Sequence, residues 1–197
     1  MKKPLSEMSL EELWQLFPII LKPHNLNYSG WYEEEKGNIL HALLGFPVTR
    51  IEHIGSTAVP GLIAKPIVDI LLEVSASCDL CKMKDCLTSA GWILMAEVME
   101  PEMKVSFNKG YTPDGFAEKV FHLHVRFSGD WDELYFRDYL IAHPETAAEY
   151  ENLKQSLLIQ FEHDRDAYTQ AKAQFVRDVS QKGRAEGVDR YKPADNF

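Results

Sequence analysis

The segment from Arg50 to Asp69 holds the residue types whose order best suits chemistry, Arg-Ile-Glu-His-Ile-Gly-Ser-Thr-Ala-Val-Pro-Gly-Leu-Ile-Ala-Lys-Pro-Ile-Val-Asp. A strand that ends in Gly55 and Ser56 is expected to expose backbone N–H groups beside a hydroxyl, and such groups bind phosphate oxygens. Gly55 lets the backbone approach a ligand closely, Lys65 adds a positive charge, and the next strand brings Asp69 to the same place. A carboxylate beside a phosphate-binding turn suits a divalent ion that bridges protein and nucleotide. The alternative is a plain tight turn with a solvated Asp69.

Two histidines form a second candidate group. Residues 121–127 alternate between apolar side chains and His122, His124 and Arg126, which is the two-residue period of a half-buried strand. The two imidazoles therefore lie on one face, about 7 Å apart along the backbone, where they could meet Asp69 across the sheet. Neutral imidazole suits Zn, Mn or Fe better than Mg. General acid–base catalysis, contacts to a ligand phosphate, and an exposed polar face without function remain alternatives.

Two Tyr–Lys pairs in the C-terminal part form a third group. Tyr150 and Lys154 are spaced i, i+4, as are Tyr168 and Lys172, so each pair shares a helix face. Together with Arg137, these lysines would supply cations that close over an anionic ligand. The alternative is amphipathic packing, with Tyr directed inward and Lys reaching solvent. That alternative is favoured for Lys154, and both remain open for Lys172 and Arg137.

Composition restricts the kinds of partner. The 197 residues are 45% hydrophobic and 26% charged, which is typical of one globular domain. A formal charge of −9 disfavours an extended nucleic-acid surface or an anionic membrane, because both require excess positive charge. The first residues lack the apolar run of a targeting segment, and three cysteines do not make a secreted disulfide framework. We expect a cytoplasmic protein whose partner is a small phosphorylated ligand or nucleotide.

Hydrophobic periodicity and turn signals predict the elements that position these groups. Strands are predicted at residues 48–54, 67–74, 92–96, 103–107 and 121–127, with the last two paired across a turn-rich segment, and a brief strand at 19–21. Helices are predicted at residues 10–17, with Ser9 and Glu12 as a capping box, and at 31–44, 79–90 and 131–143. Another helical stretch, 145–183, is expected to break near residues 163–166, where Asp164 or Asp166 would cap the last helix. Residues 1–130 would form the core, 131–187 a helical part packed on it as one unit, and 188–197 an extended or frayed tail.

These motifs, in this order, resemble the GrpB family, within the nucleotidyltransferase-fold superfamily. The matching stretches include Arg50–Leu62, Ala64–Asp69, His122–Val125, Phe136–Leu140 and the two Tyr–Lys pairs, and the resemblance covers about residues 18–180. It implies an α+β fold: a nucleotidyltransferase-like mixed β-sheet with flanking helices and a C-terminal helical part. It also implies that Gly55 and Ser56 bind a triphosphate and that Asp69 binds a divalent metal, Mg²⁺ or Mn²⁺, with Zn²⁺ as an option.

One position departs from the Asp-x-Asp pair of that superfamily. Leu71 stands where the second Asp would be, whereas two-metal phosphoryl transfer needs carboxylates on both ions. Glu73 lies too far along the strand to replace it directly. Glu52 on the preceding strand, and His122 or His124, are the candidate substitutes.

Three functions therefore remain open. The first is a divalent-metal-dependent transferase that moves a nucleotidyl or related phosphoryl group from a nucleoside triphosphate to a small acceptor. Asp69 and His124 would be its catalytic residues, and Lys65, Arg137 and Lys172 would neutralise developing charge. The second is a catalytically degenerate module that binds a nucleotide or phosphorylated metabolite. The third is a metal-binding protein or hydrolase built on the histidines.

Overall fold

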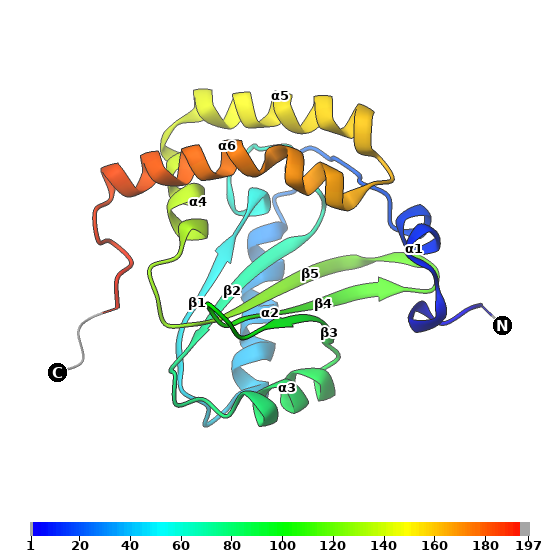
Figure 1. Cartoon of the computed structure of the whole chain (residues 1–197), viewed down its shortest axis with the longest axis vertical. Coiled ribbons are helices and arrows are strands. Elements are labelled where there is room, and N and C mark those ends of the chain that lie inside the picture. The colour runs from blue at the N-terminus through cyan, green and yellow to red at the C-terminus, as the bar shows by residue number, and fades with distance from the viewer. Residues whose placement is uncertain (1, 194–197) are drawn as a thin grey trace.

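A five-stranded mixed sheet is the centre of the fold in the computed structural model, which describes residues 2–193 (Figure 1). Its spatial order is β1-β2-β5-β4-β3, in which β2 and β5 are parallel and the other neighbours are antiparallel. The strands are β1 (Val48–Ile54), β2 (Val68–Val74), β3 (Ile93–Val98), β4 (Lys104–Thr112) and β5 (Gly115–Phe127). This mixed sheet with flanking helices confirms the fold class expected from the sequence.

One face of the sheet carries the larger apolar core. There, α2 (Tyr28–Ala42) and α3 (Leu80–Ser89) cover the alternate apolar residues of β2 and β5. Ile70 and Leu72 are fully buried in this layer. Because successive side chains of a strand point to opposite faces, Asp69, Leu71 and Glu73 must face the other side of the sheet.

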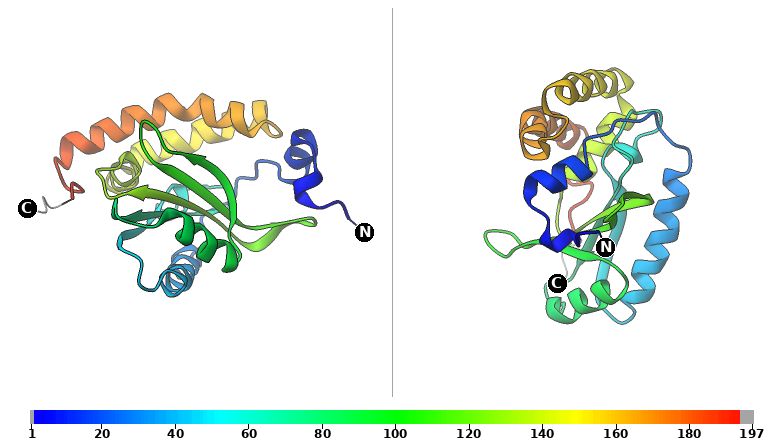
Figure 2. Two further views of the ribbon diagram at one scale, coloured as in Figure 1. Left: turned by 60° about the horizontal axis from the view of Figure 1, so that its bottom comes forward. Right: turned by 90° about the vertical axis from the view of Figure 1, so that its right-hand side faces the viewer.

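That other side is covered by α4 (Asp132–Ala142), α5 (Pro144–Phe161) and α6 (Arg165–Glu186), as the left view of Figure 2 shows. Val59 and Leu62, in the connection between β1 and β2, pack against apolar side chains of these helices. The break expected near residues 163–166 is confirmed, since α5 ends at Phe161 and the carboxylate of Asp164 accepts a hydrogen bond from the backbone N–H of Ala167, at 2.9 Å. Among the described residues, no helix is both long and apolar enough to cross a membrane.

The N-terminal segment forms a 3-10 turn, η1 (Leu5–Glu7), and a short helix, α1 (Leu10–Leu16). The capping box predicted from Ser9 and Glu12 is present. Phe17 follows the helix and packs edge-on against Tyr111, with ring centroids 4.8 Å apart. This contact fixes the end of α1 beside the sheet face that carries Asp69.

Several expected boundaries differ from the structure. The strand expected at 19–21 does not form; an isolated bridge between Lys22 and Ala64 lies close to it. α2 begins at Tyr28, three residues before the expected start. The turn-rich segment expected after residue 107 is largely strand, because β4 and β5 continue as one hairpin to a turn between Thr112 and Gly115.

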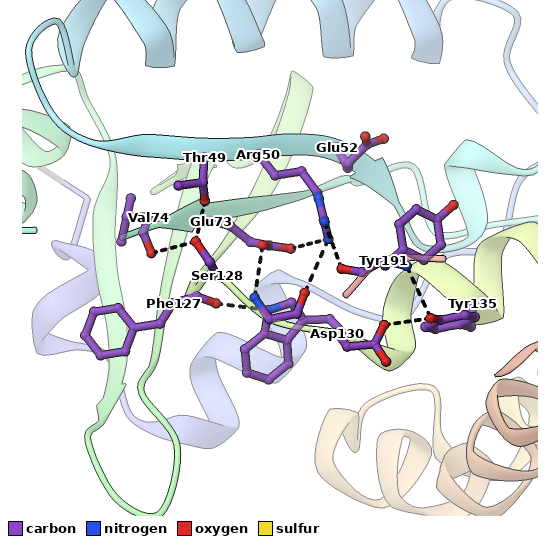
Figure 3. A network of polar contacts seen from close by, with 12 residues as sticks. Thr49, Arg50, Glu52, Glu73, Val74, Phe127, Ser128, Asp130, Tyr135 and Tyr191 are labelled. Atoms are coloured by element: carbon purple, nitrogen blue, oxygen red, sulfur yellow. Dashed lines mark hydrogen bonds and ion pairs between the residues drawn. The ribbon is translucent and has the colours of Figure 1, made fainter. Parts of the chain in front are cut away.

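A polar network at the ends of β1 and β2 that lie away from Asp69 includes Tyr191, which belongs to the tail expected to be extended or frayed (Figure 3). Arg50 donates to the buried carboxylate of Glu73 at 2.8 Å and to the backbone oxygen of Tyr191 at 2.9 Å. The backbone N–H of Gly129 donates to the other oxygen of Glu73 at 3.2 Å. Residues 188–193 are therefore held against the sheet, while 194–197 lie outside the described residues. Arg50, the first residue of the sequence motif, has a structural role.

Candidate functional site

Asp69, near the start of β2, faces a cavity of about 920 Å³ between the sheet, α6 and the N-terminal segment. Its side chain is 28% exposed. Gly55, at the end of β1, lies directly against it. A Cβ built on Gly55 would be 2.6 Å from Oδ2 of Asp69, and the backbone of Gly55 has φ +71° and ψ −170°, a region that in practice only glycine occupies. The glycine of the motif is therefore needed to make room for the carboxylate.

The two histidines converge on Asp69 from the neighbouring strand. β2 and β5 are parallel, with Asp69 opposite His122 and Leu71 opposite His124. Nδ1 of His122 lies 3.1 Å from Oδ1 of Asp69, and Nε2 of His124 lies 3.5 Å from the same oxygen. The ligand atoms of the three residues fit within 4.8 Å of one another, and no other group of three or more His, Cys, Asp or Glu in residues 2–193 does so. The convergence expected from strand alternation is present.

A chain of hydrogen bonds extends from Asp69 through His122 to α6. Tyr111 lies 2.8 Å from Nε2 of His122, and Arg165 donates to the Tyr111 hydroxyl at 3.1 Å. Burial raises the pKa of Tyr111, so this phenol keeps its proton and donates it to Nε2. Nδ1–H of His122 is then the donor to Asp69. Both ring nitrogens of His122 are thus engaged.

Electrostatics favour an ionised Asp69 beside a neutral His122. Burial raises the pKa of Asp69, but the contacts with His122 and His124 outweigh burial and hold this pKa well below its usual range. Burial also lowers the pKa of His122, partly offset by the carboxylate of Asp69. His124 makes no hydrogen bond of 3.5 Å or less to another described residue with acceptable geometry, and its ring lines the cavity. His124 is therefore the imidazole available to a ligand.

Three cations line the same cavity. They are Lys65, before β2, and Arg165 and Lys172 on α6. The ammonium groups of Lys65 and Lys172 lie 5.2 and 4.9 Å from the ring centre of Tyr168. Within residues 2–193, none of the three has a carboxylate oxygen within 4.0 Å. Burial, with the charges of Lys172 and Arg165, lowers the pKa of Lys65 to about 7. Asp69 is a nearby negative charge in the cavity, and an anionic ligand would supply the direct partner that the three cations lack among the described residues.

Two residues expected to bind phosphate lie elsewhere. Arg137 donates to Glu52 and to the backbone oxygen of His53, both at 2.9 Å, and does not line the cavity. Glu52 is the partner of Arg137 in this ion pair and does not belong to the group formed by Asp69, His122 and His124. Ser56 is also absent from the cavity lining, and its hydroxyl accepts a hydrogen bond from Lys154 at 3.4 Å. Arg137 and Glu52 form an ion pair with each other outside the cavity lining, and their ligand roles stay predictions.

Leu71 and Lys154 are both buried, which bears on what the sequence predicts for each. Leu71, at the position of the missing carboxylate, is fully buried against Ile54 and Leu134. Lys154, expected to reach solvent, is only 2% exposed, and its ammonium donates to the backbone oxygen of Ile63. Lys154 therefore braces the connection between β1 and β2.

Sequence reasoning missed Arg165, Tyr111 and the N-terminal residues that line the cavity. Arg165 belongs to the polar segment 163–166, whose residue types predict a helix break and not a ligand cation. Tyr111 falls in a stretch whose Asn, Gly, Pro and Asp residues predict turns. Simple alternation from Val105 and Phe107 would place residue 111 on their face of the sheet, but a register shift between Lys109 and Tyr111 brings Tyr111 to the face of His122.

Comparison with known proteins decides the family. A family model described as GrpB protein matches residues 18–182 of the chain. The chain belongs to the GrpB family. This confirms the resemblance found in the sequence motifs, with almost the same bounds. A crystal structure of conserved protein GrpB from Enterococcus faecalis is 26% identical, with a TM-score of 0.73, and the match covers 85% of this chain and 98% of that one.

Relatives within the GrpB family differ in length. Glutamate-rich protein GrpB from Alkalihalophilus pseudofirmus is 36% identical over 165 residues, which cover 82% of this chain and 93% of the relative. A UPF0157 protein from Pseudomonas aeruginosa is 37% identical over 77% of this chain, but only 62% of that relative is covered. A protein named dephospho-CoA kinase from Mycolicibacterium paratuberculosis is 28% identical over 165 residues, and 40% of its length is covered. GrpB-like sequence thus also forms part of longer chains.

Proposed function

We propose that the protein is a metal-dependent transferase that moves a nucleotidyl or related phosphoryl group to a small acceptor. The observation that carries the proposal is that two groups of side chains line one cavity. The first is the carboxylate of Asp69 with the imidazoles of His122 and His124. The second is the set of cations without a carboxylate partner in the described part of the chain, Lys65, Arg165 and Lys172. The first group suits a metal and acid–base chemistry, and the second suits phosphate oxygens. The relative named for a kinase of dephospho-CoA favours a small phosphorylated ligand as well.

The donor set fits one metal ion better than two. An imidazole nitrogen beside a carboxylate suits Mn²⁺ or Zn²⁺ more than Mg²⁺, which prefers oxygen ligands. A second ion would need the carboxylate that Leu71 lacks, and Glu52 is committed to Arg137. Asp69 and His122 would hold the ion, which would act as a Lewis acid toward a phosphoryl oxygen, and His124 would keep its unprotonated nitrogen for acid–base chemistry. Because Nδ1 of His122 carries the ring proton in the free protein, metal binding there would require this proton on Nε2, with the Tyr111 hydroxyl as its acceptor.

The chain's own side chains supply the remaining chemistry. Lys65, Arg165 and Lys172 bind the phosphates and neutralise charge that develops on the departing group. His124, whose Nε2 lies 3.5 Å from Asp69, accepts the proton of the acceptor hydroxyl as that oxygen bonds to phosphorus and the diphosphate leaves. Tyr111 and Arg165 hold the ring of His122 through its Nε2, and so keep Asp69 in position.

Burial of Leu71 favours a second candidate, a module that binds a phosphorylated metabolite without turnover. In that case the cation cluster would bind the ligand, and Asp69 would contribute little to affinity. A hydrolase built on the same histidines is the third candidate, with water in place of the acceptor. All three functions bind the same ligand; they differ in whether it reacts and in whether an acceptor hydroxyl or water attacks it.

Thermal unfolding with the four common nucleoside triphosphates, each with Mn²⁺ or Zn²⁺, tests the proposal. We expect at least one combination to raise the melting temperature by several degrees. Asp69→Asn should remove the metal-dependent part of that shift, whereas Asp85→Asn, a change at an exposed carboxylate on α3, should preserve it. Phosphorus NMR of the stabilising mixture with a panel of alcohols then separates transfer, hydrolysis and binding alone. The absence of a shift with any triphosphate would contradict the proposal.

A further inference from the structure

The cavity wall that α1 and β3 form is apolar, and β3 is the edge strand, separated from β2 by β5 and β4. Leu10, Leu13 and Trp14 line the cavity from α1, and Ile93 and Met95 line it from β3. α1 contains no buried residue, even though most of its apolar side chains face this space. Leu10, Ile93 and Met95 are 54%, 45% and 56% exposed. Such exposure on two elements that border one cavity leaves apolar surface that a ligand would cover.

This wall is held in place by packing and hydrogen bonds. The ring of Phe17 lies 4.8 Å from that of Tyr111 and 5.0 Å from that of Phe116. Just beyond it, the backbone N–H of Ile19 donates to the backbone oxygen of Glu162 at 2.9 Å. Tyr111 also bonds to His122, so one residue joins the apolar wall to the polar end of the cavity. The two ends therefore form one continuous binding surface.

We propose that the ligand is amphiphilic: a phosphate-bearing small molecule whose aliphatic part lies along α1 and β3. This inference rests on the proposed function, and it specifies the class of substrate. Charge complementarity orients the ligand, because Lys65, Arg165 and Lys172 fix the anionic group at one end and the apolar side chains receive the chain at the other. Residues 5–17 precede the stretch matched by the family model, so the part of the wall that α1 forms does not follow from membership of the GrpB family.

Calorimetric titration of the full chain with inorganic phosphate, methyl phosphate and n-alkyl phosphates up to n-hexyl phosphate tests the inference. Each added methylene that leaves water should tighten binding about twofold to fourfold, so the dissociation constant should fall at least about 30-fold from methyl to hexyl phosphate. Lys172→Ala should weaken the binding of every member of the series, inorganic phosphate included.

Two neighbouring residues of β3 provide a matched pair of variants. Ile93 and Leu94 are isomeric side chains with 45% and 43% exposure, but only Ile93 lines the cavity. Ile93→Ala should weaken hexyl phosphate about fivefold and leave inorganic phosphate unchanged, whereas Leu94→Ala should change neither.

The possible failures are distinguishable. Equal affinity along the series, or equal effects of the two β3 variants, would overturn the aliphatic subsite while leaving the phosphate site intact. Adenosine monophosphate that binds as tightly as hexyl phosphate, with the same sensitivity to Ile93→Ala, would assign the wall to a nucleobase and also overturn it. If Lys172→Ala leaves the dissociation constant of hexyl phosphate unchanged, the phosphate site of the proposed function is refuted, while the apolar subsite still stands. If neither phosphate nor hexyl phosphate binds, both proposals fail.

Discussion

Gly55 and Asp69 lie so close together that no side chain fits on Gly55. A Cβ on Gly55 would lie 2.6 Å from Oδ2 and 3.2 Å from Cβ of Asp69. The antiparallel pairing of Ile54 with Asp69 brings the two segments together, and the positive φ of Gly55 turns the chain away just past the carboxylate. The motif glycine therefore shapes the position of the candidate metal ligand, while the adjacent serine does not line the cavity.

Gly55→Ala should impair both folding and the site. We expect a loss of about 1–3 kcal/mol in the free energy of unfolding, because alanine is strained in this backbone region and its methyl group displaces Asp69. Binding of Mn²⁺ or Zn²⁺, measured by calorimetry, should weaken at least about tenfold, since the carboxylate must move. Gly61→Ala is the control: Gly61 has φ +78°, but no atom lies within 4 Å of its Cβ position. It should cost about 1 kcal/mol of stability and leave metal affinity unchanged. Equal metal affinity in both variants would contradict this role of Gly55.

Anion binding should weaken as pH rises through neutrality. Burial and the neighbouring cations lower the pKa of Lys65 to about 7, so Lys65 is charged at pH 6 and largely neutral at pH 8.5. Sulfate keeps its charge over this range, and its dissociation constant should therefore rise about tenfold between these two pH values. Lys65→Arg keeps a positive charge at both pH values and should flatten the profile. An equally steep profile in Lys65→Arg would show that another group titrates.

Arg137 should matter for stability and not for ligand binding. Its guanidinium contacts Glu52, Asp138 and the backbone oxygen of His53, each at 2.9 Å. Arg137→Met keeps most of the side-chain volume but leaves Glu52 without its partner, while Asp138 retains Arg190 and the Tyr191 hydroxyl. We expect about 2 kcal/mol of lost stability in urea unfolding, reduced from the value for a fully buried pair because Glu52 is 38% exposed. The affinity for sulfate should stay within about twofold of wild type. A tenfold loss of sulfate affinity in Arg137→Met would show that Arg137 does contribute to ligand binding.

The sequence predicted the convergence of Asp69 with His122 and His124 because strand alternation fixes which side chains share a face. The near-continuous apolar run of β2 likewise identified a strand covered on both sides, and the parallel pairing with β5 completed the site. These are local patterns whose consequences do not depend on distant packing.

Charged residues outside the strands were less predictable, because their partners are set by tertiary contacts. Arg137 and Lys172 both looked like ligand cations, yet Arg137 meets Glu52 from β1, and Lys172 meets no carboxylate among residues 2–193. Arg165 enters the cavity only because α6 begins at that residue and passes over Tyr111. No spacing within the sequence distinguishes these three cases.

Lys154 gives the sharpest test of how burial shapes the helical part. Its side chain is 2% exposed, and burial and the charge of Lys172 lower its pKa to about 7, well below that of lysine in an unfolded chain. Between pH 7 and about 10 the unfolded chain therefore binds a proton that the folded chain does not, so this lysine makes the protein more stable as pH rises. Lys154→Met removes that dependence. The measured quantity is the free energy of unfolding of the variant minus that of wild type. This difference should be about 2–3 kcal/mol larger at pH 6 than at pH 9.5.

Unfolding in urea at both pH values measures this difference directly. Lys182→Met, at an exposed position of α6, controls for the general effect of removing a lysine and should show no comparable change with pH. Loss of the contacts from Lys154 to Ile63 and Ser56 shifts the stability of Lys154→Met equally at both pH values, so it cannot mimic the expected trend. A difference between variant and wild type that is constant from pH 6 to 9.5 would mean that Lys154 keeps its proton in the folded protein. The positive charge beside the connection between β1 and β2 would then be permanent, and the neutral form that burial favours would not contribute to the stability of the site.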